Sequence, residues 1–307
     1  MRISVLVENE SFRPELQAEH GLSLYIEVPG VAKPGLAKQG AAKQDYSNPV
    51  AAEESRGGAG GKTILLDAGQ KELFAQNAKL MGCDLAAVDF AVLSHGHSDH
   101  AGGLPLFRIL NPRAPVFMAK AARKPNYIRR CGVLFFNVGI PRDFTSDPGT
   151  VLLSEDTEIF PGVHAVTSIR QKSPYLTSST NLYMRKGLWF AKDDFSHELA
   201  LVVNLGECSF VFSSCSHLGL HDIMAAIAEK GLLKKESHVF AGMHLYLAMK
   251  GTSESPEILD RFAEALRAFE GSTYYTGHCT GKEAFDRLKV KLGERLQSMH
   301  CGDVFVF

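Results

Sequence analysis

Apolar and polar positions along this chain follow two periods, one typical of strands and one typical of helices. Short apolar runs predict strands at residues 3–7, 21–28, 62–69, 90–93, 114–119, 157–166 (two strands and a turn), 199–204, 209–213, 238–244, 272–276 and 304–307. Apolar residues at helical spacing predict helices at residues 72–81, 104–110, 222–230, 256–269 and 282–292. Because helices are interleaved with strands, mostly in the second half, the pattern indicates an α/β fold.

One stretch departs from both periods. Residues 29–62 are rich in Gly, Ala, Lys and Gln, contain a near-repeat, and hold few large apolar side chains. A segment of this composition can bury little surface. We therefore expect a single domain over residues 1–307, with a flexible insertion at about residues 29–62 between two strands that pair as a hairpin.

Composition narrows the class of protein. The chain has 33 Lys and Arg against 34 Asp and Glu, a formal net charge of -1, so we expect no nucleic acid and no membrane surface as partner. No apolar run approaches the roughly 20 residues that a membrane-spanning helix needs. The six cysteines lack CxxC spacing and do not form a disulfide framework, so a reducing, cytoplasmic location is expected. The expected partner is a small molecule, and the sequence is compatible with a homo-oligomer.

Residues 120–130 form a local basic stretch. The basic side chains are Lys120, Arg123, Lys124, Arg129 and Arg130. One interpretation is a solvated face of a loop or helix. The other is a wall that attracts an anionic substrate.

Candidate chemistry is concentrated directly after the strand predicted at residues 90–93. Three imidazoles and one carboxylate lie within six positions there, namely His95, His97, Asp99 and His100. His95 and His97 are two residues apart, so their rings can point to one side of a tightly turned backbone and bind one metal ion. The four side chains together suit two adjacent ions, which in two-metal enzymes share a hydroxide. Further neutral imidazoles are available near predicted strands, at His197, His217, His244 and His278.

These segments resemble a known family. Residues 94–103 resemble the HxHxDH signature of the metallo-β-lactamase superfamily, and residues 65–69 resemble its strand-Asp-x-Gly element. Residues 215–219, 242–245 and 278–281 resemble the GCSHxG, GGFHL and HCTG elements of one subgroup. That subgroup comprises the metal-dependent hydrolases grouped with the ribofuranosylaminobenzene 5'-phosphate synthase-like proteins. The resemblance covers the whole chain except the 29–62 insertion.

The resemblance implies a four-layer αββα sandwich with a di-metal site at one edge. It also implies that His95, His97 and a later histidine bind the first ion, and that the second is bound by Asp99, His100 and His278. Asp67 would support the geometry of the ligands. As cofactors we expect two divalent metal ions, with zinc as first choice and manganese or iron as alternatives.

The sequence departs from the superfamily pattern at one position. Members usually bridge their two ions with an Asp at the end of a strand before a helix, whereas residues 214–217 of this chain are Ser-Cys-Ser-His. Either His217 or Cys215 takes that role, or one ion is bound more weakly; Cys215 also suits a small buried packing position. The third ligand of the first ion is His217, our first choice, or His197. We expect His244 to support the ligands or to face the substrate.

These residues predict a metal-dependent hydrolase that acts on an ester, phosphoester or lactone, with an anionic small molecule as substrate. Asp99 is expected to orient the nucleophile. Glu198 is expected to orient a ligand or to act as acid or base, unless it is a surface carboxylate. The alternatives are an activity like that of the ribofuranosylaminobenzene 5'-phosphate synthases, an iron-dependent redox enzyme of the same fold, and a non-catalytic metal-stabilised binding protein.

Overall fold

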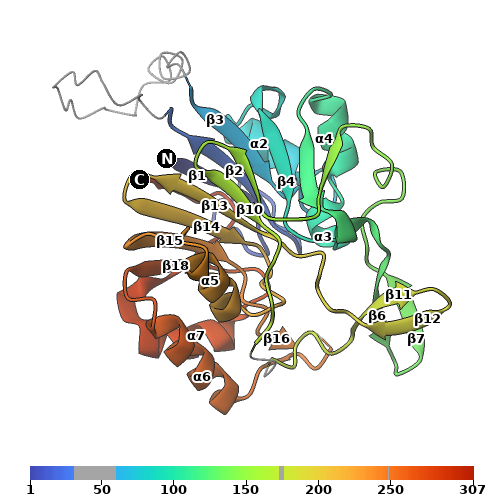
Figure 1. Cartoon of the computed structure of the whole chain (residues 1–307), viewed down its shortest axis with the longest axis vertical. Helices are drawn as coiled ribbons and strands as arrows, with labels where there is room; N and C mark the ends of the chain where they lie inside the picture. Colours follow the sequence, from blue (N-terminus) through green and yellow to red (C-terminus); the bar gives the residue numbers. More distant parts are fainter. Residues whose placement is uncertain (31–59, 173–175, 248) are drawn as a thin grey trace.

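Two seven-stranded sheets lie face to face in the computed structural model (Figure 1), which describes residues 1–30, 60–172, 176–247 and 249–307. The first sheet has the order β20 (Val304–Val306), β1 (Arg2–Val7), β2 (Ser23–Val28), β3 (Lys62–Leu66), β4 (Phe90–Leu93), β5 (Val116–Ala119) and β8 (Thr150–Leu153). The second has the order β19 (Leu296–Ser298), β18 (Ser272–Thr276), β15 (Glu236–Ala241), β14 (Cys208–Ser213), β13 (Ala200–Leu205), β10 (Val163–Val166) and β9 (Thr157–Phe160).

The core between the sheets follows from the two-residue period of the strands. In β4, Phe90 and Val92 belong to the same buried cluster as Phe212 of the second sheet. Ala91 and Leu93 belong to a different cluster, which also contains residues of the helices. Because neighbouring side chains of a strand point to opposite faces, β4 is buried on both sides.

Helices cover the outer face of each sheet (Figure 1). α2 (Leu73–Leu80), α3 (Ser98–Ala101) and α4 (Leu104–Leu110) accompany the first sheet, and α5 (Leu220–Glu229), α6 (Pro256–Arg267) and α7 (Lys282–Leu292) the second. In α6 the buried residues are Leu259, Phe262, Ala263 and Leu266, at the spacing of one helix face. The layers therefore have the order αββα, which confirms the expected fold class. Within the described residues, no helix combines the length and the apolar character that crossing a membrane requires.

Most predicted elements are present, with small shifts at their ends. β18 and α7 have the predicted bounds. β2 and β3 pair antiparallel from Leu24 with Leu66 to Val28 with Lys62, which confirms the predicted hairpin. The insertion expected at 29–62 lies almost entirely outside the described residues.

The region between β8 and β13 and the basic stretch before it differ from expectation. β12 (Trp189–Lys192), β11 (Leu182–Lys186), β6 (Asn126–Arg130) and β7 (Leu134–Asn137) form a third sheet that the pattern did not predict. The basic stretch was expected to be a loop or a helix face. It consists of the short helix η3 (Lys120–Arg123) followed by the strand β6. Pairing of β6 with β11, distant in sequence, explains why local periodicity did not reveal these strands. The remaining elements are η2 (Leu85–Ala87), η4 (Gly293–Arg295), β16 (Tyr246–Leu247) and β17 (Thr252–Ser253).

Candidate metal centre

Polar residues that follow separate strands meet at one edge of the two sheets. His95 and His97 follow β4, and α3 carries Asp99 and His100. The second sheet contributes residues that follow β14, β15 and β18, namely Cys215, His217, His244 and His278. These three strands are parallel neighbours, so their carboxyl ends open at the same edge.

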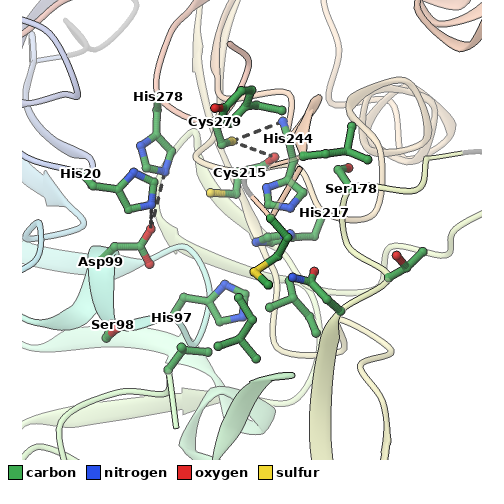
Figure 2. A pocket seen from close by; sticks show the side chains of 18 of the residues that line it. His20, His97, Ser98, Asp99, Ser178, Cys215, His217, His244, His278 and Cys279 are labelled. Atoms are coloured by element: carbon green, nitrogen blue, oxygen red, sulfur yellow. Dashed lines mark hydrogen bonds and ion pairs between the residues drawn. The ribbon is translucent and has the colours of Figure 1, made fainter. Parts of the chain in front are cut away.

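The residues surround a cavity of about 670 Å³ (Figure 2). His95 and His100 are fully buried behind its surface. The cavity is lined by the other six, which are His97, Asp99, Cys215, His217, His244 and His278. The sequence-predicted ligands are thus brought together around one space.

The backbone beside these ligands is unusual. Of the six described non-glycine residues with positive φ, five lie at or beside the candidate ligands: Asp67 (57°), Phe195 (50°), Ser216 (54°), His244 (45°) and His278 (50°). A left-handed conformation costs such residues on the order of 1–3 kcal/mol each. The surrounding structure must hold these turns in place, and such clusters are typical of functional sites.

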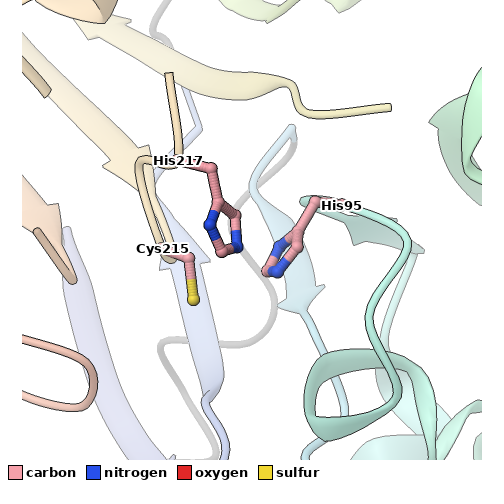
Figure 3. A group of neighbouring side chains, drawn as sticks. All are labelled: His95, Cys215 and His217. Carbon is pink, nitrogen blue, oxygen red and sulfur yellow. The ribbon is translucent and has the colours of Figure 1, made fainter. Parts of the chain in front are cut away.

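Three imidazoles form the first candidate group of ligands. The ring centroids of His95, His97 and His217 lie 4.7 to 5.0 Å apart, and the Nε2 atom of each is buried with no hydrogen-bond partner in the described chain. Buried nitrogen atoms rarely lack a partner, and a metal ion would provide one for all three. Figure 3 shows His95 and His217 with Cys215 beside them, and the ligand atoms of these three lie within 4.8 Å of one another.

A second group lies on the other side of Cys215. His100 Nε2 is 3.2 Å from His278 Nε2 and 3.2 Å from Cys215 Sγ. Asp99 Oδ2 is 3.6 Å from the His100 nitrogen and 3.7 Å from that of His278. Two nitrogens bound to one tetrahedral ion at about 2.0–2.1 Å are about 3.3 Å apart, so this spacing fits one ion. Cys215 touches both groups, and it stands where the resemblance implies a bridging Asp.

A buried hydrogen-bond network engages the Nδ1 atoms of His95 and His100. Asp67 accepts hydrogen bonds from the backbone N–H of Ser94 (2.8 Å) and from its hydroxyl (2.7 Å), and it lies 2.8 Å from His100 Nδ1. The Ser94 oxygen lies 2.8 Å from His95 Nδ1. With Nδ1 as the donor in each ring, Nε2 keeps its lone pair for a metal ion. Asp67 therefore contacts one candidate ligand directly and a second through Ser94.

The N-terminal segment contributes residues that the sequence analysis did not select. Asn9 Oδ1 lies 3.0 Å from His278 Nδ1, and the Glu8 carboxylate accepts the backbone N–H of His278. His20 Nε2 is 3.2 Å from Asp99 Oδ2. Glu8 and Asn9 directly follow a predicted strand, which is the signal that the other sites share, whereas His20 has no such signal.

Glu198 is neither a surface carboxylate nor part of the cavity lining. It is 2% exposed, and its carboxylate oxygens accept the backbone N–H groups of His217 (2.8 Å) and Leu218 (2.9 Å). Burial raises the pKa of Glu198, and these two hydrogen bonds counteract only part of that rise. Its contacts hold the turn that carries His217, and it has no contact with the space where a substrate would lie.

His197 and His217 are the two candidates that the sequence left open for the third ligand of the first ion. His197 Nδ1 accepts the backbone N–H of Gly96 at 3.1 Å, and its Nε2 lies 3.1 Å from Asp193 Oδ2. Both ring nitrogens of His197 are thus engaged, whereas Nε2 of His217 is not. His244 packs against His217 at 4.2 Å between ring centroids, and its Nδ1 is also buried without a described partner. The geometry therefore favours His217 as a ligand.

Burial keeps four ligand imidazoles neutral. In each, burial is the largest cause of a lowered pKa, which falls well below its ordinary value in His95 and His217, to about 3 in His97 and to about 4 in His278. Neighbouring histidines lower the pKa values further. Metal ions bind the neutral form of imidazole, so these rings need lose no proton when an ion binds.

The pKa values of the other three side chains favour a protonated His100, an ionised Asp99 and a protonated Cys215. Burial lowers the pKa of His100, but Asp99 and Asp67 outweigh burial and raise it to about 9. Burial raises the pKa of Asp99, but His100 and His20 outweigh it and hold this pKa well below its ordinary value. Burial, followed by Cys279, raises the pKa of the Cys215 thiol. An ion at the second group would displace protons from His100 and Cys215.

The basic stretch reaches the cavity through one residue. Of its five basic side chains, Arg130 is the one among the cavity-lining residues of the described chain. Of the five, only Arg130 has a position compatible with the second interpretation, because the other four do not line this space.

The chain is similar in sequence to known proteins. Residues 56–171 match the sequence model of the Metallo-beta-lactamase superfamily. The 7,8-dihydropterin-6-methyl-4-(beta-D-ribofuranosyl)-aminobenzene-5'-phosphate synthase of Methanocaldococcus jannaschii is 26% identical over 262 residues, which are 80% of this chain and 85% of that protein.

Solved structures share the fold. Tm1679, a metal-dependent hydrolase of the beta-lactamase superfamily, has a TM-score of 0.75 at 22% identity, covering 100% of this chain and 99% of its own. Zn(2+)-bound PqqB from Methylobacterium extorquens has a TM-score of 0.52 at 10% identity, covering 100% of both chains. The sequence match over residues 56–171 and the shared αββα fold make this chain similar to proteins of the metallo-beta-lactamase superfamily.

Proposed function

We propose that this chain is a metal-dependent hydrolase with a two-ion centre. The observation that carries the proposal is the meeting of three buried, unpartnered Nε2 atoms, those of His95, His97 and His217. Leaving each of them without a partner costs about 1–3 kcal/mol, a cost that a bound ion removes. The match of residues 56–171 to the superfamily model supports the same conclusion.

In this proposal the two groups of ligands each bind one ion. His95, His97 and His217 bind the first, and the second is bound by Asp99, His100 and His278, with Cys215 in the place of a bridging carboxylate. Imidazole and thiolate ligands favour zinc over manganese and iron. Such ions would supply Lewis-acid polarisation of an ester, phosphoester or lactone and activation of a water near neutral pH.

The chain's own residues orient the ligands and the attacking water. Asp67 and Asn9 hold His100 and His278 through Nδ1, so that each Nε2 faces the centre. Asp99 presents a carboxylate at the cavity surface, where it would orient the attacking water. We assign Glu198 a positioning task, because both of its oxygens are engaged by the turn that carries His217.

The test combines metal analysis with a substrate panel. The purified chain is loaded with zinc, manganese or iron and assayed on phosphodiesters, carboxylic esters and lactones. We expect about two ions per chain and hydrolysis of at least one class. His95→Ala should lose one of the ions and the hydrolysis. His164→Ala is the matched control, because His164 lies in β10 away from the cavity. Inactivity of every metal form on every class would overturn the proposal.

A second candidate rests on the relation to the M. jannaschii synthase, which covers 85% of that protein. We infer that the same centre could instead support a synthase activity on a ribose phosphate donor, as the name of this relative suggests. Formation of a ribosylated product by the metal-loaded chain, without hydrolysis of the panel, would favour the synthase over the hydrolase.

A reducing, cytoplasmic location and a small anionic substrate complete the proposal. All six cysteines are free thiols, which supports a reducing environment. Arg130 at the cavity supports an anionic substrate.

A further inference from the structure

Part of the cavity wall is formed by apolar side chains that are not candidate ligands. Ile128 of β6 and Leu182 of β11 line it from the third sheet, and Leu247 and Met249 line it from the segment around β16. These four side chains are apolar. A substrate whose reacting group lies at the metal ligands would therefore extend along an apolar surface.

Two cations, Arg130 and Lys250, lie on this wall, and both are exposed at the rim of the cavity. Neither forms an ion pair with a carboxylate of the described chain. The only carboxylate among the described lining residues is Asp99, which belongs to the second ligand group. The guanidinium carbon of Arg130 lies 5.6 Å from the centre of the Phe136 ring, within the range of a cation–π contact. The rim is therefore a local positive site on a chain whose net charge is close to zero.

Ser178 provides a second, independent indication of a bound molecule. It is 8% exposed, it lines the cavity, and its hydroxyl has no hydrogen-bond partner in the described chain (Figure 2). Its backbone is fixed, because Glu254 accepts the N–H groups of Thr177 and Ser178. A buried hydroxyl held rigidly without a partner is ready to bind a polar atom of a ligand.

We propose that the cavity takes an elongated substrate with an apolar or aromatic body and a terminal anionic group, which Arg130 and Lys250 bind at the rim. The reacting group would lie at the metal ligands, the body against Ile128, Leu182 and Met249, and the anion at the two cations. This inference rests on the proposed function for the position of the reacting group. It adds the substrate class and two specificity-determining residues.

Binding without turnover tests the inference. The metal-loaded protein is titrated calorimetrically with phenylbutyrate, with phenylpropylphosphonate and with the neutral phenylbutanamide. We expect both anions to bind more tightly than the amide. Arg130→Gln and Lys250→Gln should each weaken binding of the anions about fivefold and leave amide binding unchanged, as loss of one exposed charge contact predicts. A larger loss for phosphonate than for carboxylate identifies phosphate-type substrates.

Arg129→Gln is the matched control. Arg129 is the preceding residue of the same strand, and its guanidinium lies over the ring of Tyr183 at 4.8 Å on the opposite face. The inference is overturned if no probe binds, if anions and amide bind equally, or if Arg129→Gln weakens anion binding as much as Arg130→Gln does. A chain that binds anions through Arg130 but hydrolyses nothing would refute only the proposed function, since binding is measured separately.

Discussion

Replacing Glu198 by glutamine separates a positioning residue from an acid or base. Glu198 is buried, and each carboxylate oxygen accepts one backbone N–H of the turn that carries His217. In Glu198→Gln the amide oxygen still accepts one of these N–H groups. The amide nitrogen faces the other N–H and leaves it without an acceptor.

The expected magnitude follows from these two bonds. One charge-assisted hydrogen bond becomes a neutral one, at a cost of about 1 kcal/mol, and one buried N–H is left unpaired, at about 1–3 kcal/mol. Relief of the buried charge offsets part of the sum, so we expect a loss of about 2 kcal/mol in the free energy of unfolding. Because the disturbed turn carries a ligand, affinity for the first ion should fall about 10- to 100-fold.

Two measurements on one pair of variants check the predicted losses of stability and of metal affinity. Urea unfolding gives the free energy of unfolding, and competition with a chromophoric chelator gives the zinc affinity of each site. Glu254→Gln is the matched control, since Glu254 is also buried and accepts the N–H groups of Thr177 and Ser178 but holds no candidate ligand. One oxygen of Glu254, Oε1, accepts both N–H groups, and the other accepts the Thr177 hydroxyl, so Glu254→Gln can keep both N–H acceptors and should be destabilised less. Weaker zinc binding is expected only in Glu198→Gln.

The reasoning would be refuted if Glu198→Gln bound zinc normally at both sites and lost activity with an altered pH–rate profile. That result would make Glu198 an acid or base in spite of its engaged oxygens. Normal zinc affinity together with normal activity would instead show that the turn keeps its shape without the carboxylate, and would also contradict the assigned task.

Three further outcomes follow from the geometry. His217→Ala should lose one ion per chain by metal analysis while His197→Ala retains both, because only His217 has a free Nε2; the reverse order would contradict the ligand assignment. Cys215→Ser should abolish the sulfur-to-cobalt charge-transfer band of the cobalt-loaded protein and weaken the second ion; an unchanged spectrum would exclude Cys215 as a ligand. In the metal-free protein the folded-state pKa values of His97 (about 3) and His278 (about 4) lie below the unfolded value of about 6.5, so the unfolded state binds more protons on acidification. The free energy of unfolding should therefore fall as pH drops from about 6.5 toward 4, by up to about 1.4 kcal/mol per pH unit for each histidine, and a flat urea-unfolding profile between pH 7 and 5 would contradict this.

Local patterns were sufficient for much of the fold and part of the site. The period of apolar residues is a local property, so α7 and β18 were predicted with their bounds. The cluster at residues 94–100 stands out because its ligands are neighbours in sequence. His217, His244 and His278 could be selected because each is close to the end of a predicted strand. The third sheet was not predictable in this way, because its strands pair across a long stretch of chain.

Only the tertiary structure decided how these residues are used. His197 precedes β13 and His217 follows β14 of the same hairpin, and the local pattern made His217 the first choice without excluding His197. The difference lies in partners from elsewhere, because Gly96 and Asp193 engage both nitrogens of His197. Cys215 stands between two ligand groups because β4 and β14 belong to facing sheets.

The sequence by itself determined which chemistry is available: imidazoles, a carboxylate and thiols at the ends of strands. The tertiary structure decided which atoms face one another, because burial and hydrogen bonding depend on residues that are distant in sequence. Glu8 and His278 illustrate the reason, since they are 270 positions apart and directly bonded. A local pattern carries no information on such a contact, which the packing of the two sheets creates.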